Sequence, residues 1–146
     1  MKKNKNGFTM TEFVVTIAIM GTLLSMAVPK FTNVSEETQA ERNLANMHTI
    51  REVFFHYFYR SMQRKGYVAH FPPAPTNSGG LMDDEWSRAA IDSSISPTSP
   101  NNLFSRGEVP KNANNNPFKY STWSDTVQYT GEIRYFIKIE DSDLDS

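Results

Sequence analysis

The sequence GFTMTEFVVTIAIMGTLLSMAVP, which occupies residues 7–29, is almost wholly apolar and contains a single charged residue, Glu12. As an α-helix, the 22 residues from Phe8 to Pro29 extend over about 33 Å, against about 30 Å for the hydrocarbon core of a bilayer. A charged acid costs roughly 2.5–3.5 kcal/mol at the centre of such a helix, and less near the interface. Residues 8–29 are therefore predicted to form a transmembrane helix, and Glu12 is predicted to need a cationic partner.

The charges on either side of this helix predict its orientation. Lys2, Lys3 and Lys5 precede the apolar run, and no lysine or arginine lies within it. The positive-inside rule then places the amino terminus in the cytoplasm and the chain from Lys30 onward on the far side. The chain has no cysteine, so the exported part must fold on its hydrophobic core without disulfides. A length of 146 residues allows one membrane segment and one small domain.

The helical pattern continues beyond the apolar run. Apolar or small residues recur at helical spacing at Phe31, Val34, Leu44, Met47, Ile50, Phe54, Tyr57 or Phe58, and Ser61 or Met62. Residues 30–65 are predicted to be the amphipathic half of one long helix that ends at Gly66. The aromatic block at residues 54–59 is too dense for one helix face, so part of it should meet a second surface, such as a neighbouring subunit.

Two residues weaken the helix locally. Pro29 costs about 3 kcal/mol in a regular helix, and Gly21 costs about 1 kcal/mol relative to alanine. We expect a kink near Pro29 in the isolated chain, and residues 21–29 to be the part of the helix that can unwind.

The remainder of the chain divides into a connection and a sheet. Residues 66–117 are rich in proline, glycine and asparagine, and we expect a long surface-facing loop with a short helix after Asp83. Residues 118–146 are predicted to form an antiparallel sheet and an acidic tail, with strands at 118–123, 126–129 and 132–140 and a turn at Ser124-Asp125. The alternation of Ile133, Tyr135, Ile137 and Ile139 predicts one face directed at the helix. The expected fold class is α+β, with the long amino-terminal helix packed on a small antiparallel sheet of three or four strands.

The beginning of the chain resembles a known family. Gly7-Phe8-Thr9-Met10-Thr11-Glu12, followed by the apolar helix, is similar to the signal of type IV pilins and of the pseudopilins of type II secretion. Gly21 and Pro29 also stand where the family often has these residues. The resemblance extends from about Lys2 to Phe31. Met10, Thr11 and Phe13 depart from the family's usual leucine, isoleucine and leucine.

The resemblance implies a processing pathway and a set of partners. A prepilin peptidase would remove residues 1–7 as a cytoplasmic leader by cutting between Gly7 and Phe8, and the new terminus would be methylated. Glu12 would guide assembly with other copies or other pilins, on an inner-membrane assembly platform, and residues 21–29 would loosen in the filament. The subunit would be stored in the inner membrane as a single-pass protein and then enter a periplasmic pseudopilus or an extracellular pilus.

Physical chemistry supports a pairing between the new terminus and Glu12. Cleavage before Phe8 creates an α-amine that is largely protonated at neutral pH. In lipid, this cation and Glu12 of a neighbouring subunit neutralise each other in a low dielectric. An intrachain pair is a second arrangement, because residues four apart share a helix face. Thr9-Met10-Thr11-Glu12 also has the form of a capping box, which needs no partner chain.

Other interpretations of the amino terminus stay open at this stage. The helix could be a simple anchor for an extracytoplasmic binding domain. An ordinary signal peptidase could also cut after Ser25-Met26-Ala27 and release a secreted domain that begins at Val28.

No catalytic residue, cofactor or metal site is predicted. The three histidines, His48, His56 and His70, have no metal-ligand spacing. Asp141, Asp143 and Asp145 alternate like the start of a calcium loop, but a solvated acidic tail is the simpler expectation. Removal of residues 1–7 takes the net charge from −1 to −4, which does not indicate nucleic-acid binding. The sequence therefore favours a structural subunit over an enzyme. It leaves open whether the filament is a surface pilus, a secretion pseudopilus or a DNA-uptake pilus, and whether the chain is a major or a minor subunit.

Overall fold

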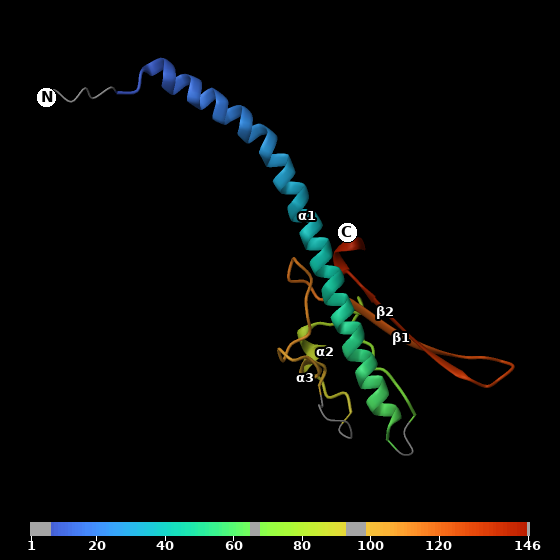
Figure 1. Ribbon diagram of the computed structural model, residues 1–146. Helices are drawn as coiled ribbons and strands as arrows, with labels where there is room; N and C mark the ends of the chain where they lie inside the picture. The colour runs from blue at the N-terminus through green and yellow to red at the C-terminus, as the bar shows by residue number, and fades with distance from the viewer. Residues whose placement is uncertain (1–6, 65–67, 93–98, 146) are drawn as a thin grey trace. The chain divides into compact units, whose positions relative to one another are not determined.

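The computed structural model describes residues 7–64, 68–92 and 99–145, and it has the predicted α+β fold (Figure 1). A long amino-terminal helix precedes two short helices and a two-stranded antiparallel sheet. The elements in chain order are α1 (Met10–Met62), α2 (Asp84–Arg88), α3 (Pro100–Leu103), β1 (Lys119–Thr126), β2 (Ile133–Glu140) and the 3-10 helix η1 (Ser142–Asp145).

The chain divides into two compact units, Met1–Gln39 and Ala40–Ser146. Helix α1 contributes to both, and its helical backbone is uninterrupted through Gly21 and Pro29. Its last helical residue is Met62, and the predicted end at Lys65 and Gly66 lies outside the described residues.

The predicted inward face of α1 is largely confirmed in the second unit. Ile50, Phe54 and Tyr57 are at most 1% exposed. Leu44, however, is 60% exposed, so its placement on this face was wrong. The face turns polar there, because Asn43 and Asn46 take the inward positions and bond to other parts of the domain.

Phe54 lies at the centre of the aromatic core. Its ring makes edge-on contacts with Tyr120, Trp86 and Phe104, at centroid distances of 4.7, 6.3 and 6.4 Å. The Tyr120 hydroxyl donates to the Pro72 carbonyl oxygen at 2.8 Å, and burial raises the pKa of this phenol. The aromatic block therefore does divide between two environments, since Tyr59 at its end is 55% exposed.

The connection after α1 is not the surface loop that the sequence suggested. It supplies buried side chains to the core, namely Phe71, Pro72, Met82, Pro100, Phe104 and Val109. Its first part is anchored at the end of α1 by Ser61, whose fully buried hydroxyl donates to the Phe58 carbonyl and accepts from the His70 amide. The expected short helix is confirmed as α2, which Asp83 caps by accepting from the Trp86 amide at 2.9 Å. Two strands are too narrow to cover the aromatic face of α1, so the connection covers the rest.

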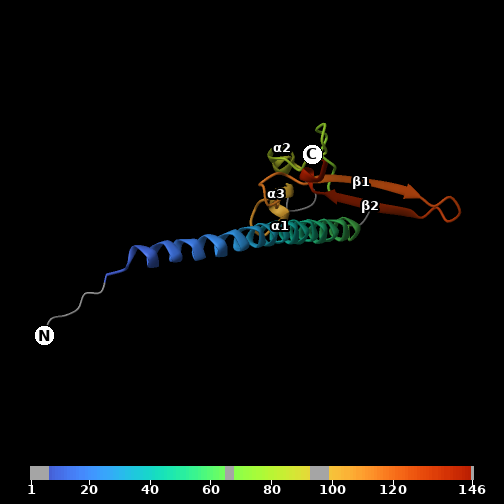
Figure 2. The same ribbon diagram turned by 90° about the horizontal axis from the view of Figure 1, so that it is seen from above.

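The sheet is smaller than predicted. Within the described residues it has two strands, paired from Lys119 opposite Glu140 to Thr126 opposite Ile133. The predicted turn at Ser124-Asp125 was wrong, because both residues lie within β1. Residues 127–132 form the hairpin loop instead, with Gly131 at a φ of 68°, and Figure 2 shows this loop projecting from the rest of its domain. Two isolated bridges, between Leu81 and Lys119 and between Lys111 and Pro117, stand in place of a further strand.

The predicted inward face of β2 is confirmed over most of its length. Tyr135, Ile137 and Ile139 pack against the core cluster, whereas Ile133, at the hairpin end, is 49% exposed. On the opposite face Trp123 and Phe136 stack with ring centroids 5.5 Å apart.

The acidic tail folds back onto the domain, contrary to the expectation of a solvated tail. Asp141 is buried and accepts from the Asn112 side chain at 2.8 Å and from the Asn43 side chain at 2.5 Å. Asp143 accepts from Asn112, Asn114 and Asn116 at 2.7–2.8 Å. Because the Asn112 side-chain oxygen accepts from two backbone amides, its NH₂ group must face the carboxylates. We call this group of aspartates and asparagines the amide clasp.

Replacing Asn112 should destabilise the domain more than replacing Asn114. Asn112→Ala removes a donor from the buried Asp141 carboxylate, and such a loss typically costs about 1–3 kcal/mol. Asn114→Ala affects only the more exposed Asp143 and should cost less. Urea unfolding of the full chain in detergent micelles, followed by the fluorescence of its two tryptophans, of which Trp86 packs against the core, measures both. Equal losses would contradict the central place of Asn112 in the amide clasp.

The amide clasp should also make stability depend on acid. Hydrogen bonds, first from Asn114 and then from Asn116, hold the pKa of the Asp143 carboxyl below its ordinary value. Because the folded-state pKa is the lower one, the stabilisation is present above the unfolded pKa and is lost as pH falls through the folded pKa. Between about pH 5 and about pH 3, the parent chain should therefore lose more unfolding free energy than Asp143→Asn. Equal losses of unfolding free energy in the parent chain and in Asp143→Asn would refute the assignment of this acid sensitivity to Asp143.

Candidate functional site

The amino-terminal end of α1 is a capping box. The Thr9 amide donates to Glu12 Oε2 at 3.0 Å, and the Glu12 amide donates to Thr9 Oγ1 at 3.3 Å. The first backbone bond of the helix runs from the Phe13 amide to the Thr9 carbonyl at 3.1 Å. These bonds satisfy two amides that an uncapped helix leaves unpaired, and they hold the carboxylate at the positive end of the helix dipole.

The capping box leaves Glu12 able to bind a second group. Only Oε2 takes part in the cap, and no hydrogen bond reaches Oε1 in the part of the chain that the structure describes. Glu12 is also exposed. A carboxylate has about four acceptor positions, so capping and pairing with a cation are compatible. The structure therefore confirms that Glu12 caps the helix. In an apolar environment the Glu12 carboxylate would still need a cationic partner.

Gly7 and Phe8 lie just before the helix, in backbone without regular structure. Phe8 is 81% exposed. A β-carbon added to Gly7 would meet no described atom within 4 Å, and Gly7 is not among the glycines with positive φ. Neither crowding nor backbone conformation thus requires glycine at this position. The peptide bond between Gly7 and Phe8 is accessible, and a requirement for Gly7 would come from recognition by another protein. The lysines at positions 2, 3 and 5 lie outside the described residues.

The helix that follows is apolar on all sides. Met10–Ala27 is long and apolar enough to cross a membrane, with a mean hydropathy of 1.7, and none of it is buried within the structure. Three of its hydroxyls are satisfied internally, since Thr16, Thr22 and Ser25 each donate to a backbone carbonyl three or four residues earlier. A helix that is apolar all round needs lipid or other protein chains around it.

The two predicted flexibility residues lie within this helix but show no special contact. A β-carbon at Gly21 would meet no described atom within 4 Å, so packing within the chain does not require glycine there. Pro29 has helical backbone, and its side chain lies outside the described part of the structure. The structure thus brings Gly7, Phe8 and Glu12 together at one helix end, and places Gly21 and Pro29 farther along the same helix.

One cluster of charged side chains was missed by the sequence analysis. Arg42 on α1 and Arg106 in the connection line a common groove, although 64 positions separate them in the chain. Each appears in the sequence as an ordinary surface arginine, and only the folded connection brings them together.

Comparison with known proteins agrees with the amino-terminal geometry. A family model described as the prokaryotic N-terminal methylation motif matches residues 2–28. No curated protein and no solved structure matches the chain. The matched residues include the accessible bond after Gly7, the capped Glu12 and the exposed apolar helix. Residues 2–28 of this chain therefore carry the signal of type IV pilin and pseudopilin precursors.

Proposed function

We propose that this chain is a structural subunit of a helical filament, either a type IV pilus or a type II secretion pseudopilus. In this proposal a prepilin peptidase cuts after Gly7, Phe8 becomes the methylated terminus, and α1 passes from the inner membrane into the filament core. The amino terminus starts in the cytoplasm, and residues from Lys30 onward lie outside the cytoplasmic membrane. The chain acts through assembly with other pilins and has no catalytic role.

The observation that carries the proposal is one carboxylate on an otherwise apolar, uncovered helix. Glu12 is the sole acid of the segment Met10–Ala27, and none of that segment is buried. A helix that serves only as a membrane tether or as an ordinary export signal gains nothing from a carboxylate within its apolar segment. A subunit that must be pulled from lipid into a bundle gains a specific partner, because each new terminus supplies a cation for a neighbour's Glu12.

Variants at Glu12 separate capping from charge pairing. Glu12→Gln keeps a side chain that can cap Thr9 but removes the negative charge, whereas Glu12→Val removes both. Both variants should be cut after Gly7, and both should lower the yield of sheared filaments by at least about tenfold, because the amine loses its counter-charge in an apolar core. The measurements are the mass of the membrane-bound subunit and the amount of sheared filament.

A matched control tests the alternative directly. Thr9→Ala removes the hydroxyl of the capping box but leaves the Glu12 charge, and it should assemble as well as the parent chain. Normal assembly of Glu12→Gln together with failed assembly of Thr9→Ala would show that Glu12 is only a helix cap. Normal assembly of all three variants would show that filament formation needs neither the cap nor the Glu12 charge, whereas a parent chain that forms no filament would point to a simple membrane anchor.

A further inference from the structure

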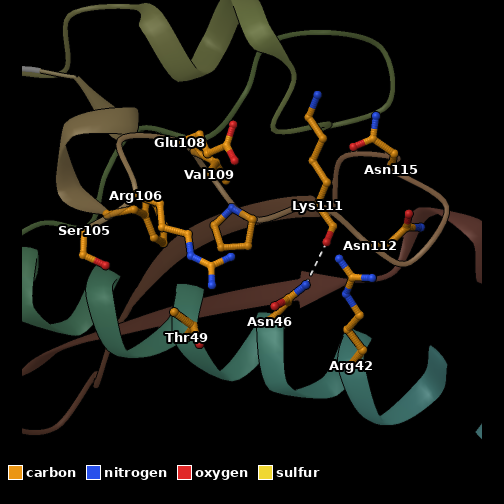
Figure 3. A pocket seen from close by; sticks show the side chains of 12 residues that line it. Arg42, Asn46, Thr49, Ser105, Arg106, Glu108, Val109, Lys111, Asn112 and Asn115 are labelled. Carbon is orange, nitrogen blue, oxygen red and sulfur yellow. Dashed lines mark hydrogen bonds between the residues drawn. The ribbon is translucent and has the colours of Figure 1, made fainter. Parts of the chain in front are cut away.

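A groove with a positive lining lies between α1 and the connection. It has a volume of about 630 Å³. Arg42, Asn46 and Thr49 line it from α1, and Ser105, Arg106 and Lys111 line it from the connection. Figure 3 shows the guanidinium groups of Arg42 and Arg106 directed into the space between these two elements.

The two arginines of this groove are not neutralised by the domain. Lys111 Nζ already lies 3.3 Å from the Asp84 carboxylate. Within residues 7–64, 68–92 and 99–145, neither Arg42 nor Arg106 forms an ion pair. Glu108 is the only acid in the lining, and Figure 3 shows its carboxylate directed away from the Arg106 guanidinium. Two guanidinium groups at one groove favour carboxylate ligands, which they can bind through paired hydrogen bonds.

The chain itself carries an unpaired acidic surface of the matching kind. Glu37 and Glu41 are exposed and stand four residues apart on α1, and neither forms an ion pair among the described residues. Like charges at this spacing share a helix face and repel each other. A cationic partner from another molecule would relieve this repulsion.

The subunit offset of the proposed filament brings these two surfaces to the same level. When the Phe8 amine of one subunit pairs with Glu12 of its neighbour, the first subunit is displaced along the filament axis relative to that neighbour. The displacement equals the length of four helical residues, about 6 Å. All equivalent atoms of two subunits in a helical filament share one axial offset. Glu37 of the raised subunit then lies level with residue 41 of its neighbour, one residue or about 1.5 Å from the level of Arg42. Glu41 lies level with residue 45, beside Asn46 in the groove.

We propose that the groove lined by Arg42 and Arg106 binds the Glu37 and Glu41 carboxylates on α1 of the neighbouring subunit in the filament. This inference rests on the proposed filament function and adds a second charge pairing, outside the membrane, to the one at Glu12. The pairing fixes the rotation of neighbouring subunits as well as their axial step, because the groove lies on one side of α1.

Charge reversal and rescue in the full-length chain test this contact. Arg42→Glu and Glu37→Arg, the two residues that the offset brings to nearly the same level, should each lower the filament mass per cell by about tenfold at an unchanged level of membrane subunit, since each places like charges together. The chain carrying both substitutions should regain most of the parent yield. Arg134→Glu, on exposed β2 and outside the groove, is the matched control and should assemble normally.

Each other result overturns the inference. Parent-like assembly of the single variants would show that the groove makes no contact needed for assembly. Loss without rescue in the double variant would show that the groove binds a different carboxylate partner. Both results leave the filament function standing, because the parent chain and Arg134→Glu still assemble. A parent chain that forms no filament and keeps its leader refutes the proposed function instead.

Discussion

The apolar surface of the first half of α1 has no partner among the residues that the structure describes, and the organisation of the protein follows from this constraint. Eleven large apolar side chains between Phe8 and Met26 are more than half exposed. At roughly 1.5–3 kcal/mol for each buried side chain, covering them is worth on the order of 15–30 kcal/mol. That is more than the total stability of a typical small domain. The segment must therefore always be surrounded by lipid or by other helices, and the proposed filament function would have to move it between these environments without exposing it to water.

In the proposed filament, Glu12 gives the transfer of this helix from lipid to the bundle direction and specificity. An apolar helix transfers from lipid to a helix bundle with little gain from the hydrophobic effect, because lipid tails are as apolar as leucine side chains. A carboxylate that pairs with a cation only in the bundle makes the transfer favourable and selects one offset between neighbours. The capping box holds this carboxylate in place through one oxygen and leaves the other accessible. In the proposed filament, capping and assembly are thus two uses of one side chain.

Several features of the fold could be predicted because they depend on local patterns. The helix start at Thr9, the buried face of Ile50, Phe54 and Tyr57, the helix after Asp83 and the strand at 133–140 all follow from capping or periodicity. The covering role of the connection could not be predicted, because Phe71, Met82 and Phe104 occur among prolines and glycines without a regular spacing. The strand Lys119–Thr126 is mostly polar, so its true length was hidden.

The amide clasp and the arginine groove were missed for a different reason. Each is built from residues that are ordinary in the sequence and far apart along it, such as Asn43 with Asp141, or Arg42 with Arg106. A single asparagine or arginine predicts a solvated surface, and only the folded chain shows its partner or the lack of one. At the amino terminus, by contrast, Gly7, Phe8 and Glu12 are neighbours in the sequence, so the methylation motif that they belong to could be identified from the sequence.

The central claim is that the mature subunit begins at Phe8 and presents its amine to Glu12. The most direct measurement is the mass of the amino-terminal peptide of the mature protein from purified membranes or sheared filaments. The account predicts a peptide that begins at Phe8 and carries one added methyl group. A peptide that begins at Val28 would identify a conventionally secreted domain, and one that retains Met1 and the leader would identify a membrane-anchored domain; either result would contradict the account.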